Sequence, residues 1–165
     1  MNKMLAWADR RLILIQKLII SGLLAAILLL ALIQILFRYF LYISGAWTEE
    51  LARLGLVWAI FLSASLGVRL KSHTILDFFL LRVPVKMRHV MTIITAMMIM
   101  GMGIVMIIYG LKYAMMTSGD TTTSLGFERN LFYIPVPFTG VLITLYAIGD
   151  MAAEINGFLK FKKGA

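Results

Sequence analysis

Most residues that could do chemistry lie in one stretch, residues 47–77. Glu49 and Glu50 open it, and Arg53 follows four and three residues later, so on a helix either carboxylate can pair with the same guanidinium. One interpretation is an interfacial ion-pair set, which contributes about 0–1 kcal/mol. The other is a pairing site for a partner protein. The residues alone leave both interpretations open.

Other kinds of chemistry are excluded by what the sequence lacks. There is no cysteine, which removes disulfides, thiol catalysis and Cys-ligated metals. The two histidines, His73 and His89, belong to one basic connection, whereas a haem-binding bundle needs axial ligands within its helices. No G-x-S-x-G element provides a serine nucleophile. We therefore expect no catalytic, cofactor or metal site, and no enzyme.

The composition sets the class of protein. Of the 165 residues, 61% are hydrophobic and 15% are charged, and the apolar residues form long blocks. About 20 apolar residues are enough to cross a bilayer as a helix. The sequence therefore predicts an all-α integral membrane protein with one domain, residues 1–165. We expect a basic amphipathic interfacial segment at 1–17 and four transmembrane helices, at about 18–40, 48–70, 86–116 and 131–155.

The basic residues predict the orientation. Lys and Arg cluster at both ends of the chain and in the connection after residue 68, and cytoplasmic segments carry such clusters. Both termini are therefore expected in the cytoplasm, and the net charge of +8 reflects lipid anchoring rather than nucleic-acid binding. The predicted cytoplasmic anchor consists of Arg69, Lys71, His73, Arg82, Lys86 and Arg88.

The predicted helix 48–70 has two different faces. Ala59, Ser63 and Gly67 form a small-residue row that lets another helix approach closely. On nearly the opposite face lie bulkier or polar residues: Trp47, Trp58, Phe61, Ser65 and Arg69. Either these faces meet the chain's own helices and lipid, or one of them docks a second protein.

No charged residue falls in the central third of any predicted span, although ion-coupled transport usually needs one there. We therefore do not expect the chain to drive transport by itself. A self-contained oligomeric channel or small exporter remains the alternative to an accessory subunit.

Several motifs in order resemble the small membrane subunit of tripartite ATP-independent periplasmic (TRAP) transporters. They are W-T-E-E-L-A-R at 47–53, V-W-x-x-F-L at 57–62, R-x-K-x-H-T-I-x-D at 69–77 and T-T-S-L-G at 122–126. Phe37-Arg38-Tyr39 and Ile134-Pro135 extend the resemblance over nearly the whole chain. The family-type positions are Trp47, Glu49, Glu50, Arg53, Trp58, Arg69, His73 and Asp77.

The resemblance implies a role that depends on partners in the bacterial inner membrane. In such transporters a periplasmic protein captures an organic acid, such as a sialic acid or a dicarboxylate. A large membrane subunit then moves it inward with the sodium gradient. The small subunit would scaffold the large one and help dock the binding protein. The partner-interface candidates are Trp47, Glu49, Glu50, Arg53, Trp58, Ala59, Ser63, Gly67 and Arg69.

Overall fold

The computed structural model describes residues 3–42, 45–70 and 85–163. Four long helices make up most of it: α1 (Lys3–Leu36), α2 (Ala46–Arg69), α4 (Val85–Met116) and α5 (Pro135–Lys163). A π-helical turn, η1 (Phe37–Leu41), extends α1, and a 3-10 turn, η2 (Arg129–Phe132), precedes α5. The predicted all-α class with four apolar helices is confirmed.

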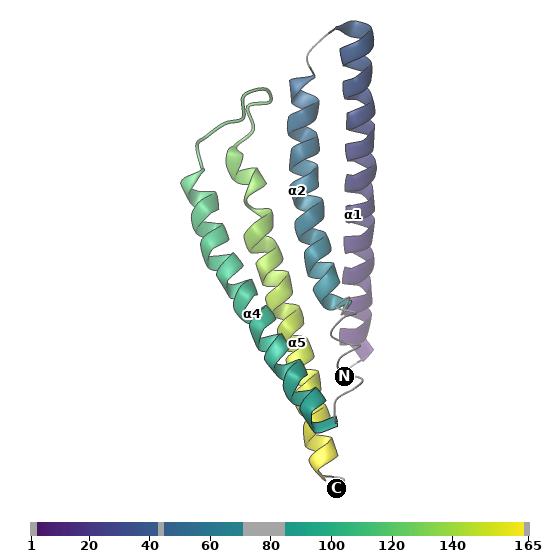
Figure 1. Ribbon diagram of the computed structural model, residues 1–165, viewed down its shortest axis with the longest axis vertical. Helices are drawn as coiled ribbons and strands as arrows, with labels where there is room; N and C mark the ends of the chain where they lie inside the picture. The colour runs from purple at the N-terminus through teal and green to yellow at the C-terminus, as the bar shows by residue number, and fades with distance from the viewer. Residues whose placement is uncertain (1–2, 43–44, 71–84, 164–165) are drawn as a thin grey trace.

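The helices form a single layer (Figure 1). Contacts run from α1 to α2, from α2 to α5 and from α5 to α4, so α1 and α4 occupy the outer positions. The two helix pairs α1–α2 and α4–α5, which we call the two hairpins, lie closest together at the end where both termini are, which we call the termini end. They spread apart toward the loop end, which holds Tyr42, residues 45–46 and residues 117–134.

All four helices are long and apolar enough to cross a membrane. The candidate spans are Asp9–Phe40, Ala46–Arg69, Val90–Met116 and Arg129–Ala152. Large apolar side chains such as Leu28 and Met98 are about two-thirds exposed, as expected of a surface made for lipid or for another membrane protein.

The interfacial segment expected at residues 1–17 is not a separate element. Residues 3–17 are the first turns of α1, and the helix continues unbroken to Leu36. No proline lies between Lys3 and Phe37, and no glycine stands at or next to Lys17, so nothing ends the helix there. The helix, extended by η1, ends instead at Leu41 and is followed by Tyr42, which has a left-handed φ of 53°.

Close packing joins α4 to α5. A Cβ atom at Gly110 would lie 2.8 Å from the ring of Pro137, and one at Gly140 would lie 2.8 Å from the carbonyl oxygen of Gly103. Without side chains at these positions the two backbones can approach closely, as small residues allow in membrane helices. Pro135 begins α5, where its missing N–H costs nothing.

Candidate functional site

The charge cluster at the start of α2 divides into two parts. Arg53 donates to Glu49 at 2.8 Å, and both side chains are more than half exposed. Glu50 does not pair with Arg53. Its two carboxylate oxygens accept the backbone N–H groups of Ser124 and Leu125, at 2.9 and 3.1 Å. Glu50 thus ties α2 to the connection between α4 and α5.

That connection has an ordered turn. Thr121 and Glu128 form an isolated antiparallel bridge, and the backbone N–H of Thr122 donates to the carbonyl oxygen of Phe127 at 2.8 Å. Gly126 has a φ of 68°, which a residue with a side chain adopts only with strain. The turn therefore presents two N–H groups to Glu50. The motifs 47–53 and 122–126, far apart in sequence, meet through these bonds.

A cavity of about 560 Å³ lies beside this tie, at the loop end. It opens between α2, the 117–134 connection and the start of α5. Its lining combines charged or hydroxyl groups with apolar side chains: Glu50, Arg53, Val57, Phe61, Thr122, Thr123, Arg129, Phe132, Tyr133 and Val136.

The small-residue row on α2 is only partly used inside the chain. Ala59 is buried, with 2% of its surface exposed. Ser63 is exposed, and no atom lies within 4 Å of the position that a Cβ on Gly67 would take. With Leu56 and Ile60, which are also exposed, these two residues form a strip along α2 that the described residues leave uncovered.

The two tryptophans of α2 contact different neighbours. Trp47 lies 6.0 Å from the ring of Phe37 in η1, measured between centroids, and stays 36% exposed. Trp58 lies 6.2 Å from the ring of Phe138 on α5. Trp58 thus helps to hold the two hairpins together, while Trp47 is partly available at the surface.

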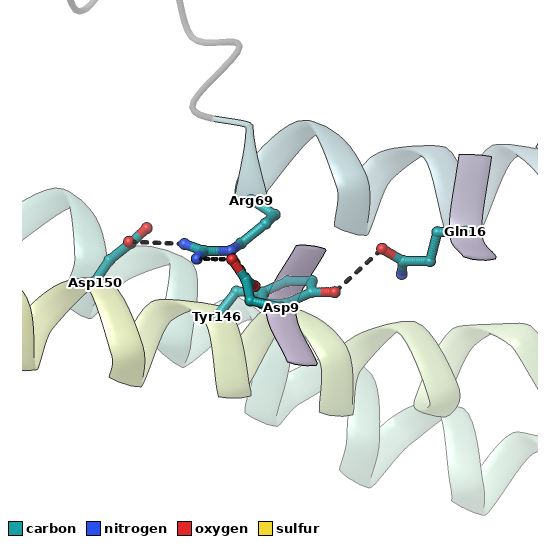
Figure 2. Close-up of polar contacts among 5 residues, drawn as sticks. All are labelled: Asp9, Gln16, Arg69, Tyr146 and Asp150. Carbon is teal, nitrogen blue, oxygen red and sulfur yellow. Dashed lines mark hydrogen bonds and ion pairs between the residues drawn. The ribbon is translucent and has the colours of Figure 1, made fainter. Parts of the chain in front are cut away.

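At the termini end, Arg69 joins three helices (Figure 2). Its Nε donates to Asp9 of α1 at 2.8 Å, Nη2 donates to the other oxygen of Asp9 at 2.5 Å, and Nη1 donates to Asp150 of α5 at 3.3 Å. The guanidinium also lies 5.7 Å from the ring of Tyr146. A planar guanidinium can hold two carboxylates in this way because its donors point in fixed directions.

A second set of side-chain hydrogen bonds lies one to two helical turns farther from the termini end. The hydroxyl of Tyr146 donates to Gln16 at 3.1 Å, and the amide of Gln16 donates to Ser65 at 3.1 Å. Gln16 and Ser65 are 6% and 0% exposed, and buried polar groups need such partners. Figure 2 shows Gln16 and Tyr146 directed toward each other beside the Arg69 cluster.

The sequence-based inference missed the partners Asp9, Gln16, Tyr146 and Asp150. The sequence did contain a usable signal. Asp9 and Asp150 are acids near the ends of two spans, and Arg69 is a cation at the end of a third span on the same predicted side of the membrane. Of the other anchor residues, Lys71, His73 and Arg82 lie outside the described residues, as does the family-type position Asp77. Lys86 and Arg88 are in the first turn of α4, and their side chains are not among those described. In the described part, no group of three His, Cys, Asp or Glu side chains could hold a metal ion.

Comparison with known proteins decides the family. The family described as "Tripartite ATP-independent periplasmic transporters, DctQ component" matches residues 27–157. The chain belongs to this DctQ family. It is therefore a small TRAP transporter component and a multi-pass membrane protein, and the family is one of transporter components rather than enzymes.

The DctQ chain is also similar to a curated protein, the isethionate TRAP transporter permease protein DctMQ of Oleidesulfovibrio alaskensis. The two are 23% identical over 146 residues, which cover 84% of this chain and 23% of the relative. The chain thus spans about a quarter of the length of the relative that it matches.

Proposed function

We propose that this DctQ chain is a scaffold on which a large multi-span TRAP subunit assembles in the bacterial inner membrane. The observation that carries the proposal is the uncovered strip on α2, formed by Leu56, Ile60, Ser63 and Gly67. Lipid offers little hydrophobic drive for helices to associate, so close packing over small residues is the usual means of joining them. Ser63 and Gly67 supply such a surface to a helix from another subunit.

The relative supports this assignment. That relative is a TRAP transporter permease protein, DctMQ, and this chain matches 23% of it, so most of the relative's length lies outside the matched part. We infer that the large subunit performs the transport step here. The chain itself has no charged residue in the middle of any span and catalyses no reaction in this proposal.

The loop end is the proposed docking surface for a periplasmic substrate-binding protein. Trp47, Glu49 and Arg53 are exposed there, and Glu50 fixes the neighbouring turn against α2. A charged rim on a fixed surface steers the approach of a partner. This placement requires both termini to be cytoplasmic, which agrees with the concentration of Lys and Arg near the termini and in the connection after α2.

The proposed cargo is an organic acid taken up with sodium. A sialic acid or a dicarboxylate is the substrate class that we propose. Isethionate, named for the relative, is likewise an organic anion. Recognition would lie in the binding protein and the large subunit, so no residue of this chain is assigned to the substrate.

The test of the scaffold is co-purification with the large subunit. Gly67→Leu should reduce the amount of large subunit retained, whereas Gly101→Leu, at another open glycine on α4, should not. Undiminished retention with Gly67→Leu would remove the strip as the interface. Organic-acid uptake that persists after deletion of the chain would remove the scaffold proposal. Flux through the reconstituted chain alone would favour a channel instead.

Docking has its own test. Arg53→Ala should weaken uptake or binding-protein capture while insertion stays normal, and Arg38→Ala, exposed at the same end, serves as the control. Unchanged uptake with Arg53→Ala would leave the Glu49–Arg53 contact as a surface ion pair without a docking role.

A further inference from the structure

We propose that the cavity at the loop end is a binding site for one phospholipid, with its phosphate near Arg129 and Arg53 and an acyl chain between α2 and α5. The proposal goes beyond the scaffold and docking roles and needs neither of them. It concerns the 560 Å³ cavity, whose lining includes both charged or hydroxyl groups and apolar side chains.

The cavity lining includes unused groups of the kind that bind phosphate. Among the described residues, the side chains of Arg129 and Thr123 have no hydrogen bond or ion pair with the protein. Arg53 forms an ion pair with Glu49, but its guanidinium remains exposed and has further N–H donors that this pair does not use. Guanidinium groups and hydroxyls are the common protein ligands of phosphate.

The acidic residue in the cavity does not cancel this charge. Glu50 lines the cavity, but both of its carboxylate oxygens receive backbone N–H groups, from Ser124 and Leu125. The backbone N–H groups of the turn therefore already satisfy the Glu50 carboxylate. Glu128, next to Arg129 in sequence, accepts from the side-chain amide of Asn130. Arg129 is left as a cation without an acidic partner among the described residues.

The cavity-lining residues of α2 beyond Arg53 and of the first turn of α5 are apolar. Val57 and Phe61 lie one and two turns farther along α2 than Arg53, and Val136 lies on α5. From Arg53 to Phe61 the helix rises about 12 Å. A polar rim above an apolar trough of this length suits an amphiphile better than a free anion, which would leave the trough unfilled.

The position in the fold favours lipid over a peptide. The cavity lies at the end of a single layer of spanning helices, where the hairpins spread apart, and Arg53 is only about 10 Å along α2 from Ala46. Because Arg53 lies near the start of the candidate span Ala46–Arg69, we expect the headgroups of one leaflet at this level. A double-chain phospholipid can therefore enter sideways from the bilayer, with no opening of the helices.

Native mass spectrometry of the full chain, released from mixed micelles, tests the proposal. The probes are phosphatidylglycerol and a diacylglycerol with the same acyl chains. One phosphatidylglycerol should remain bound, and the diacylglycerol should not. Arg129→Gln should lower apparent lipid affinity about fivefold, while Lys112→Gln, which removes an exposed cation of α4 outside the cavity, should leave it unchanged.

The apolar part is tested separately. Phe61→Asn should also reduce retention, and Ile60→Asn, at the neighbouring exposed position outside the lining, should not. Equal retention by the parent and Arg129→Gln would overturn the proposal, as would equal retention of diacylglycerol. Displacement of the lipid by inorganic phosphate alone would show a free-anion site. If Arg129→Gln weakens partner binding but not lipid retention, the site is a protein contact. The free-anion result and the protein-contact result each refute the proposed lipid site.

Discussion

Replacing Arg69 should lower the free energy of unfolding more than replacing any exposed cation of the chain. The guanidinium makes three hydrogen bonds to carboxylates, two with Asp9 and one with Asp150, and these bonds connect α2 to α1 and to α5. The side chains of Arg69 and Asp9 are 24% and 27% exposed. In Arg69→Leu the carboxylate of Asp9 would lose its cation, and Asp150 would lose one of its partners.

The size of the effect follows from this burial. Removing one member of a buried ion pair costs about 3–5 kcal/mol, because a charge is left without compensation. Here about a quarter of each side chain reaches solvent, which weakens the penalty, so we expect a loss of about 2–3 kcal/mol. Arg69→Lys retains the charge but not the paired donors to Asp9, and should cost about 1 kcal/mol.

Thermal unfolding of the purified chain in detergent, followed by tryptophan fluorescence, measures this difference. Arg69→Leu should lower the Tm by about 4–12 °C at the usual 2–4 °C per kcal/mol for a chain of this size. The matched control is Arg53→Leu, which removes an exposed pair between residues four apart on the same helix. That control should cost about 0.3–0.5 kcal/mol.

A rescue experiment distinguishes the uncompensated charge from lost packing. The triple variant Arg69→Met, Asp9→Asn, Asp150→Asn has no charge left in the cluster and should regain most of the lost stability. If Arg69→Leu melts with the parent, or no lower than Arg53→Leu, the three-helix tie contributes nothing to stability. If the triple variant melts below Arg69→Leu, the attribution to unpaired charge is wrong.

Three further variants test other parts of the fold in the same melting assay. Gly110→Ala should destabilise the chain by about 1–3 kcal/mol because the new methyl would collide with Pro137, whereas Gly101→Ala, in open space, should gain about 0.5–1 kcal/mol; equal effects would contradict close α4–α5 packing. Thr139→Val should leave the stability unchanged or raise it by about 1 kcal/mol, because the buried Thr139 hydroxyl has no hydrogen-bond partner among the described residues. A clearly lowered Tm would contradict this and show that the hydroxyl makes a stabilising hydrogen bond. Gly67→Leu should leave the melting of the isolated chain unchanged, and a lowered Tm would show that Gly67 packs within the chain.

The helices themselves were predictable because long apolar runs have few conformations available in a membrane. Each run long enough to span became a helix, and Pro135 begins α5 as its fixed φ favours. The order of the helices in the layer was not predictable. Helical periodicity shows which residues share a face, but not which helix covers it. Ser65 was therefore grouped with Trp58 and Arg69 without its partner Gln16 on α1.

The polar ties were missed for a related reason. Glu50 stands three residues from Arg53, so sequence spacing favours that pair. In the folded chain the turn at 122–126 offers two backbone N–H groups to the same carboxylate, and these donors are 74 and 75 residues away. Backbone donors leave no mark in the sequence. Asp9 was overlooked because basic neighbours dominate its segment, although an acid there needed a cation.

The Glu50 and Arg69 contacts both belong to the helix that carries the proposed partner surface. Both begin on α2, with Glu50 near its start and Arg69 at its end, and they reach the 117–134 connection, α1 and α5. The uncovered strip at Ser63 and Gly67 lies on the same helix, between them. A subunit seated there contacts the element that holds the others in place. Breaking the Arg69 tie should therefore weaken partner assembly only together with the stability of the chain, whereas Gly67→Leu should weaken assembly alone. That difference separates a contact surface from the framework that supports it.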